Sequence, residues 1–316
     1  MTVSSFKTGF DGVSFLAGNA AFIPAVRALI IGGFDNSIGY NTVDYVDIST
    51  TGNATDFGDL TATRWAFGAC GSSTRAVVGG GANGGGNTAC NIIEYFTIAS
   101  TGNGTDFGDL TYTAGSVNAA SNSTRGIFAG GYDGSNYRNE INYITIATTG
   151  NATDFGDLAA GRANAGGCAS PTRAVFGGGD ENGGSNRIEY LTIATTGNAT
   201  SFGTLTAARN TLAALSSSTR GLWAGGGTSN VIDYITIATT GNATDFGDLT
   251  LARNAPTGTS SSTRGIFSGG RDQGPPAIVN IIDYVTIATT GNATDFGDLT
   301  VARGWAASTS NAHGGL

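Results

Sequence analysis

Apolar and polar residues along this chain follow a pattern that repeats every 44–50 residues. In each copy an Arg opens a short apolar run that ends in Gly-Gly, as in Arg-Gly-Ile-Phe-Ser-Gly-Gly at 264–270 (segment B). A longer apolar run follows at 280–289 (segment C), and then Thr-Asp-Phe-Gly-Asp-Leu-Thr at 294–300 (segment D). β-Branched and aromatic residues dominate these runs and no window has a helical period, so each segment predicts a β-strand.

A fourth segment, rich in small and polar residues, precedes each segment B, as at 253–262 (segment A). Small residues suit an innermost strand, where several sheets converge on one axis and leave little room. Segment C is apolar on both faces, which is typical of a sheet packed between two neighbouring sheets. Each copy therefore predicts four strands in the order A, B, C and D.

Three landmarks fix the register of the copies. The Tyr of segment C precedes the Phe of segment D by 12 residues in every copy, and the next segment-B Arg follows 18 residues later, as in Tyr45, Phe57 and Arg75. The gap between Gly-Gly and the Tyr varies from 7 to 13 residues, so the length variation falls in the B–C loop. The landmarks are Arg27, Arg75, Arg125, Arg173, Arg220 and Arg264; Tyr45, Tyr95, Tyr143, Tyr190, Tyr234 and Tyr284; and Phe57, Phe107, Phe155, Phe202, Phe246 and Phe296.

Repeats of this length and regularity indicate propeller blades or solenoids rather than separate domains. Four strands in each copy predict an all-β fold, a six-bladed β-propeller of four-stranded antiparallel blades. Closing the ring removes the exposed edge strands. A β-solenoid is the alternative, although it needs shorter rungs and two capped ends, for which the chain shows no clear segment.

The two ends of the chain compete for the innermost place in the first blade. The C-terminal segment 302–312 matches the internal A segments from Arg303 onward, whereas 17–26 contains Phe22, Ile23 and Pro24 and lacks their Ser run. We expect the C-terminal strand to close the ring; the alternative is that 17–26 forms this strand. Residues 1–25 are then an N-terminal arm, apolar enough to dock on a partner, and residues 26–316 are the propeller.

This order of segments resembles the kelch repeat over residues about 17–311, with the Gly-Gly and the following Tyr as the matching positions. The Trp that is usual in the family's last strand is Phe here, as at Phe57. The wording of the repeat, Ile-Asp-Tyr-Ile-Thr-Ile-Ala-Thr-Thr-Gly-Asn-Ala-Thr-Asp-Phe-Gly-Asp-Leu-Thr, also resembles repeats in structural proteins of tailed phages that infect marine bacteria. The resemblance implies a virion component, assembled in the host cytoplasm, that contacts other virion proteins through residues 1–25 in a homo- or hetero-oligomeric assembly. An extracellular protein is the alternative.

The charge and the histidine content exclude several classes of function. The formal net charge is −8, from 15 basic and 23 acidic residues, which argues against nucleic acid and against anionic membrane surfaces. No stretch approaches the ~20 apolar residues of a membrane span, and the N-terminus lacks a secretion signal. The only histidine is His313, and the three cysteines are too scattered for a zinc site. We therefore expect no cofactor, no metal and no enzymatic activity.

Several repeated motifs are interpreted as structural. Asp-Phe-Gly occurs five times, and each of the six copies has an Asn-x-Thr after its segment C, as at Asn292. Both motifs predict turns, and we expect the Asn to bond its own backbone. We expect the segment-B arginines to form bridges with the aspartates of segment D. A second set of arginines in the D–A connections is also expected to be structural: Arg64, Arg162, Arg209, Arg253 and Arg303.

The B–C loops are the one place where the copies differ, and they are rich in Asp, Asn, Tyr and Arg. In an antiparallel blade these loops share one face with the D–A connections, and such side chains suit recognition of sugars or proteins. The candidate binding residues are Asp35, Asn36, Asn83, Asp133, Tyr137, Arg138, Asp180, Glu181, Arg187, Arg271 and Asp272. We expect a non-enzymatic phage attachment, tail-fibre or decoration protein that binds a host glycan or protein; the alternative is a free lectin or a carbohydrate-active propeller enzyme.

Overall fold

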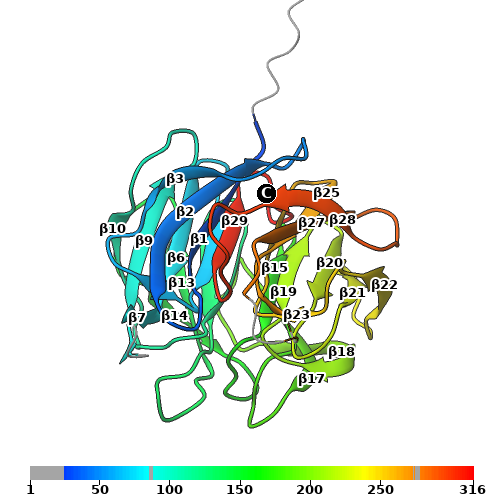
Figure 1. Cartoon of the computed structure of the whole chain (residues 1–316). Coiled ribbons are helices and arrows are strands. Elements are labelled where there is room, and N and C mark those ends of the chain that lie inside the picture. The colour runs from blue at the N-terminus through cyan, green and yellow to red at the C-terminus, as the bar shows by residue number, and fades with distance from the viewer. Residues whose placement is uncertain (1–24, 85–87, 273, 275–277) are drawn as a thin grey trace, which may run out of the picture.

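The computed structural model describes residues 25–84, 88–272, 274 and 278–316, so the predicted arm lies, except for Ala25, outside the described residues. The described chain is all-β and is built mainly of four-stranded antiparallel sheets (Figure 1). It contains no α-helix, and accordingly no helix of the kind that could cross a membrane. The predicted fold class is confirmed at this level.

Six sheets have four strands each, and their strand order follows the predicted segments A to D. The first sheet combines the two ends of the described chain: β29 (Ala307–Ser310), β1 (Arg27–Phe34), β2 (Gly39–Asp47) and β3 (Thr55–Asp59). The second contains β5 (Gly68–Gly71), β6 (Arg75–Gly79), β9 (Ile92–Thr97) and β10 (Thr105–Asp109). The third contains β11 (Asn118–Ser121), β12 (Arg125–Ala129), β13 (Glu140–Thr145) and β14 (Thr153–Asp157).

The remaining three sheets repeat this order. The fourth contains β15 (Gly166–Ala169), β16 (Arg173–Gly177), β17 (Ser185–Thr192) and β18 (Thr200–Arg209). The fifth contains β19 (Ala213–Ser216), β20 (Arg220–Ala224), β21 (Val231–Thr236) and β22 (Thr244–Asp248). The sixth contains β24 (Thr257–Ser260), β25 (Arg264–Ser268), β27 (Ile281–Thr286) and β28 (Thr294–Asp298).

Two small sheets, which the sequence did not predict, link the D–A connections to the B–C loops. One joins β4 (Arg64–Trp65), β7 (Ala82–Asn83) and β8 (Thr88–Ala89), and the other joins β23 (Arg253–Asn254) to β26 (Arg271–Asp272). Single antiparallel bridges do the same elsewhere, for example Gly115 with Tyr132 and Ala163 with Asp180. The variable loops are therefore held on the body of the protein by backbone hydrogen bonds.

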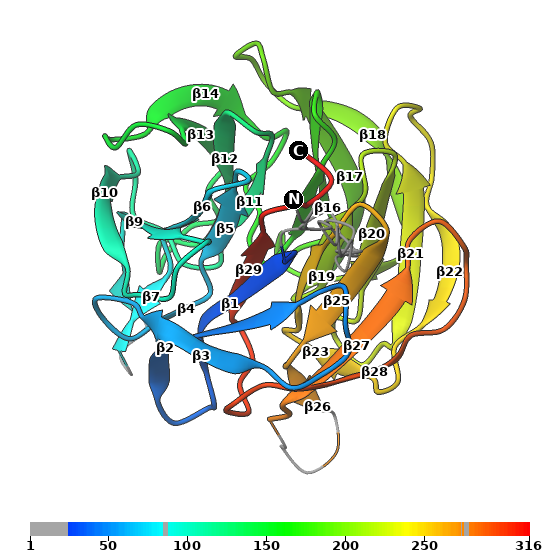
Figure 2. The same cartoon turned by 90° about the horizontal axis from the view of Figure 1, so that it is seen from above.

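The A strands lie nearest the centre, and the sheets are arranged around them (Figure 2). Each A strand contacts the A strands of both neighbouring sheets, in the cyclic order β5, β11, β15, β19, β24, β29 and back to β5. In the first sheet, β29 pairs antiparallel with β1, from Ala307 opposite Ile31 to Ser310 opposite Ala28. The C-terminal strand thus occupies the innermost position that a preceding A segment fills in the other sheets.

The hydrophobic core is divided into six clusters, each between two neighbouring sheets. Leu29 and Phe57 of the first sheet, for instance, pack against Val78 and Phe96 of the second. The last cluster joins the first sheet to the sixth and includes Ile30 and Phe296. All six segment-D phenylalanines are at most 4% exposed, and each meets the Tyr of its own sheet edge-to-face with ring centroids 5.8–6.1 Å apart.

The Asn of each Gly-Asn turn forms a different hydrogen bond from the one predicted. Its side-chain Oδ1 accepts a hydrogen bond from a backbone N–H of the preceding sheet, as Asn103 does from Asp59 at 3.0 Å, instead of bonding its own backbone. The same contact joins the sixth sheet to the first, where Asn53 accepts from Asp298 at 3.1 Å. The glycine of Phe-Gly is required nearby, since a Cβ on Gly58 would collide with the carbonyl oxygen of Gly102. These turns therefore join neighbouring sheets at their outer strands.

The segment-B arginines also differ from the prediction, because none of the ion pairs among the described residues involves them. Instead the guanidinium of Arg27 lies 5.0 Å from the ring centre of Tyr45 and donates to the carbonyl oxygens of Ile98 and Ala99 in the second sheet. Arg264 makes the equivalent bonds from the sixth sheet to the carbonyls of Ile48 and Ser49 in the first. The expected Arg–Asp bridges are thus replaced by Arg–carbonyl bonds between sheets.

Buried ion pairs hold five of the six D–A connections against the sheet that follows each of them. Arg209 pairs with Asp233 at 2.7 Å, and its Nη1 donates to the carbonyls of Gly225 and Val231. The other pairs are Arg64–Glu94, Arg162–Glu189, Arg253–Asp283 and Arg303–Asp44. Since Asp44 lies in β2 and Arg303 precedes β29, the last pair joins the two ends of the described chain.

The third sheet replaces both partners of this pair at once. Ala114 stands where the other copies have Arg, Tyr112 lies two residues before it, and Asn142 stands where they have Asp or Glu. The Tyr112 hydroxyl bonds the carbonyls of Gly130 and Glu140, which are equivalent to the carbonyls that Nη1 bonds in Arg64, Arg162 and Arg209. A neutral pair therefore fills the place of the buried salt bridge.

This natural replacement predicts how the ion pair at Arg209 and Asp233 responds to mutation. Asp233→Asn alone, or Arg209→Ala together with Ala207→Tyr, leaves one buried charge without its partner, which costs about 3–5 kcal/mol. Combining all three changes reproduces the Asn142, Ala114 and Tyr112 arrangement and should cost less than either change by itself. Urea unfolding of the four proteins measures the coupling, and additive losses would contradict the interpretation.

Candidate functional site

The loop face is the end of the sheets that carries the B–C loops and the D–A connections. The aspartates predicted to bind a ligand there first organise their own loops. The Asp35 side chain accepts hydrogen bonds from the backbone N–H groups of Ser37 and Ile38, both at 2.8 Å, and Asp133 accepts from Ser135 and Asn136 in the same way. These hydrogen bonds from backbone N–H groups are the main reason why the pKa of the Asp35 and Asp133 carboxyl groups is lowered. Asp180 and Asp272 close similar turns by accepting from Gly183 and Gly274.

The third and fourth B–C loops enclose a groove with a volume of about 540 Å³. Tyr132, Ser135, Asn136 and Tyr137 line one side, Glu181 and Asn182 line the other, and Ala160 and Gly161 of the D–A connection lie between them. The rings of Tyr132 and Tyr137 are 5.2 Å apart and tilted by 49°, and Tyr132 is 38% exposed. The groove thus offers an accessible aromatic surface beside amide, hydroxyl and carboxylate groups.

The charged side chains around the groove are paired with one another. Arg138 bonds Asp133 at 3.2 Å and also pairs with Glu140, while Glu181 lies 3.4 Å from Arg187. Burial, followed by a hydrogen bond to the Asp180 carboxylate, raises the pKa of Tyr137, so its hydroxyl stays protonated near neutral pH. Because no cation is left free in this network, the groove favours a neutral ligand over an anionic one.

Only part of the predicted set lies at the groove. Tyr137 and Glu181 line it, and Asp133, Arg138, Asp180 and Arg187 hold its walls. The others lie on the loops of different sheets and do not line it: Asp35 and Asn36 on the first, Asn83 on the second, and Arg271 and Asp272 on the sixth.

Sequence reasoning missed Tyr132, Ser135, Asn136 and Asn182 as lining residues. A signal existed one residue before the D–A arginine, where the fourth sheet has Gly161 and the other copies with this arginine have Thr or Ala. A Cβ at this position would collide with the backbone of Tyr137. The substitution to Gly therefore lets the third loop lie on the next D–A connection.

A second candidate region lies along the central axis, between the A strands. Before each A strand one non-glycine residue has a left-handed backbone, with φ between 51° and 54°: Ala66, Ser116, Asn164, Thr211, Ala255 and Trp305. The N–H of each donates to the carbonyl of the same residue in the preceding copy, and Ala66 donates to Trp305 at 2.8 Å. Six hydrogen bonds thus form a continuous cycle, the axial ring, at the loop-face end of the axis.

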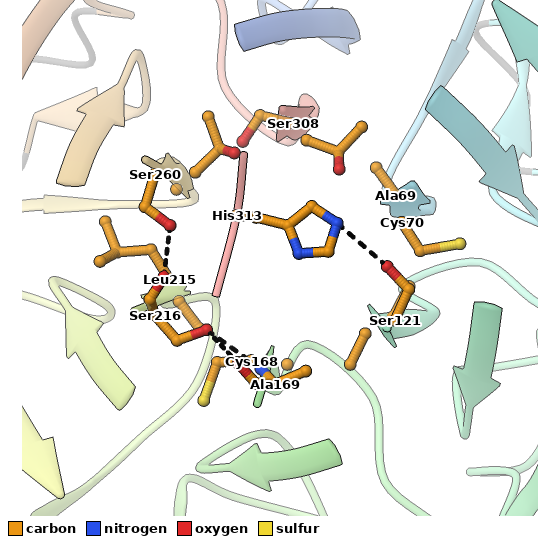
Figure 3. A pocket seen from close by; sticks show the side chains of 17 residues that line it. Ala69, Cys70, Ser121, Cys168, Ala169, Leu215, Ser216, Ser260, Ser308 and His313 are labelled. Atoms are coloured by element: carbon orange, nitrogen blue, oxygen red, sulfur yellow. Dashed lines mark hydrogen bonds between the residues drawn. The ribbon is translucent and has the colours of Figure 1, made fainter. Parts of the chain in front are cut away.

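The C-terminal residues cross the opposite end of the axis. His313 projects among the A strands (Figure 3), and its Nε2 lies 2.9 Å from the carbonyl oxygen of Gly71 and 3.3 Å from Ser121 Oγ. Its Nδ1 accepts from the N–H of Gly315, so Nε2 carries the proton and donates to Gly71. Both ring nitrogens are engaged in holding the tail, and within the described residues no group of His, Cys, Asp and Glu is arranged to hold a metal ion.

The state of His313 makes stability depend on pH. Burial lowers the pKa of His313 below its ordinary value of 6.5, although the bond to Gly71 opposes part of this shift. The folded protein then binds fewer protons than the unfolded chain, so the contribution of neutral His313 is complete above about pH 6.5 and is lost as the pH falls through the lowered pKa. We expect His313→Gln to flatten the decline in unfolding free energy below pH 6.5. Identical urea-unfolding profiles for both proteins across this range would contradict the assignment.

No protein-family model matches the chain, and no curated protein matches it. The strands and sheets define the fold class, and the groove and the central axis are the two candidate sites.

Proposed function

We propose that this chain is a non-enzymatic binding protein that recognises a glycan or a protein surface through its loop face. The groove of the third and fourth loops is the observation that carries the proposal. It is the place where loops that differ between copies combine the exposed Tyr132 and the half-buried Tyr137 with hydrogen-bonding side chains. Loops held on a rigid scaffold are well suited to specific recognition.

The proposal includes a finer description of the fold, a six-bladed, kelch-like β-propeller whose first blade is completed by the C-terminal strand. Its support is the pairing of β29 with β1, the Arg303–Asp44 ion pair and the bond from Ala66 to Trp305. Each repeats at the junction of the chain ends a contact found between other copies. The kelch-like assignment is supported by the Gly-Gly and Tyr landmarks of the repeat.

Tyrosine rings beside amide and carboxylate groups favour a neutral glycan as the ligand. The apolar face of a sugar stacks on an aromatic ring, while its hydroxyls bond amides such as those of Asn136 and Asn182. The turns closed by Asp133 and Asp180 fix the two loops before a ligand arrives, which reduces the entropy lost on binding. An uncharged protein surface is the second ligand class that this chemistry accommodates.

We further propose that the protein is part of a phage particle, as a tail-fibre, decoration or attachment protein anchored by residues 1–25. The resemblance of the repeat sequence to phage structural proteins supports this proposal. The arm, except for Ala25, lies outside the described residues. A free lectin or a carbohydrate-active enzyme is the alternative. The copy number of the protein in purified particles separates a virion component from a free lectin.

Variants in the groove test the binding proposal. Tyr132→Ala and Tyr137→Ala should each weaken binding to the best ligand of a glycan array or to host-cell surfaces by about tenfold, since an aromatic contact contributes about 1–2 kcal/mol. Thr228→Ala, an exposed change in the fifth loop, is the matched control and should bind as the parent does. Equal binding by all four proteins would show that the groove is not the recognition site.

A further inference from the structure

The six positions of the axial ring have a left-handed backbone, which glycine adopts with the least strain, yet each carries a residue with a side chain. A left-handed φ is strained for residues with a Cβ, and it is most unfavourable for β-branched ones such as Thr211. Most other described residues with positive φ in this chain are glycines. Retained side chains at a strained, rigid position point to a role for the side chains themselves.

The side chains of the axial ring divide into a polar half and an apolar half. Ser116, Asn164 and Thr211 precede the A strands of the third, fourth and fifth sheets, and Ala255, Trp305 and Ala66 precede those of the sixth, first and second. All six line a hollow of about 90 Å³. A ligand at this mouth would therefore meet hydroxyl and amide groups on one side and an indole on the other.

A second hollow of about 110 Å³ continues the first along the A strands, because the two share lining residues that include Asn118. Asn118 is only 3% exposed, and its Nδ2 donates to the carbonyl of Ala129 at 3.0 Å. Its Oδ1 accepts no hydrogen bond from the described part of the chain, and it is not among the fully buried polar atoms, so it can be reached from the hollow. A ligand hydroxyl or a water can therefore donate to it.

The far end of the axis is occupied by the C-terminal tail. Gly314 and Gly315 pack so closely on the carbonyls of Ser217 and Ser121 that neither position has room for a Cβ. His313 lines the space beneath them, between the A strands. A ligand therefore enters from the loop face, and the axis is a pocket with one open mouth.

The chemistry of this pocket selects its ligand. None of the residues that line the two hollows carries a charge, which disfavours ions and charged side chains. The polar half disfavours a purely apolar group, since the Ser116 hydroxyl and the Asn164 amide would lose their hydrogen bonds to water. A neutral sugar ring satisfies both halves, with a C–H face for Trp305 and hydroxyls for Asn164 and Thr211. The Thr211 hydroxyl donates to the carbonyl of Asn210 at 2.7 Å, so it meets a sugar hydroxyl as an acceptor.

We propose that the mouth of the axial pocket binds one neutral pyranose ring, as a site separate from the groove. This proposal rests on the proposed function for its ligand class, a neutral glycan. The residues that form the axial site are separate from those of the groove. Because one sugar ring would make a small contact area and few hydrogen bonds at this mouth, we expect a dissociation constant on the order of 1 mM for a free monosaccharide. Binding should also perturb the fluorescence of Trp305.

Glycine substitutions in the axial ring test the site without disturbing the backbone. Glycine adopts a left-handed φ freely, so Asn164→Gly and Thr211→Gly should unfold at the same or a higher temperature than the parent. Each should weaken binding of glucose, galactose, mannose or N-acetylglucosamine, whichever binds best, by about tenfold in calorimetric titration, since a hydrogen bond to the sugar is lost. Ala255→Gly is the matched control, because it changes the same ring position without removing a polar group.

Three outcomes would overturn the proposal. In the first outcome, the parent protein binds none of the four sugars at tens of millimolar concentration. In the second, Asn164→Gly and Thr211→Gly bind the sugar as tightly as Ala255→Gly does. In the third outcome, Tyr132→Ala abolishes monosaccharide binding while the axial glycine variants retain it, which places the sugar in the groove and supports the proposed function without the axial site. Loss of binding in the axial variants with retention in Tyr132→Ala supports the axial site.

Discussion

The pairing of the C-terminal strand with the first sheet is the contact on which the rest of this structure depends. β29 supplies the innermost strand of a sheet whose other three strands lie more than 240 residues earlier, and Arg303 places its guanidinium against Asp44. The core cluster between the sixth and first sheets, the Asn53 contact and the Arg264 bonds then reproduce what every other pair of neighbouring sheets makes. Each sheet consequently has a neighbour on both faces, and the apolar residues on both sides of the C strands are covered.

This frame separates the parts of the protein that repeat from those that vary. Contacts between sheets use side chains that recur in nearly every copy, such as the arginine bonds to carbonyls and the asparagine bonds to backbone N–H groups. Departures from the repeat occur in matched pairs that fit one another. Tyr112 changes together with Asn142, and Gly161 makes room for the backbone at Tyr137. Both departures involve the third sheet or its loop, which contributes the two tyrosines of the groove.

Much of the fold could be predicted from the sequence, because the period, the landmark residues and the two-sided apolar strands recur six times. The candidate site was less predictable for physical reasons. Sequence gave no sign that the segment-B arginines bond carbonyl oxygens, since every residue has a carbonyl and nothing marks the acceptor. Asp35 and Asp133 suited a ligand by residue type, yet the backbone N–H groups just after them are their nearest partners. The axial ring was missed because Ala, Ser, Asn, Thr and Trp share no sequence signature for a left-handed backbone.

Hydrogen exchange at the six amides of the axial ring tests the central claim, that the chain ends complete one continuous ring. Five of these amides donate to the preceding copy along the chain, and the sixth, at Ala66, donates across the junction to Trp305. If the ring is continuous, Ala66 should exchange as slowly as Ser116, Asn164, Thr211 and Ala255, because all open only when the structure unfolds as a whole. Fast exchange at Ala66 with protection at the others would show that the ring is open between Trp305 and Ala66, and it would contradict the account.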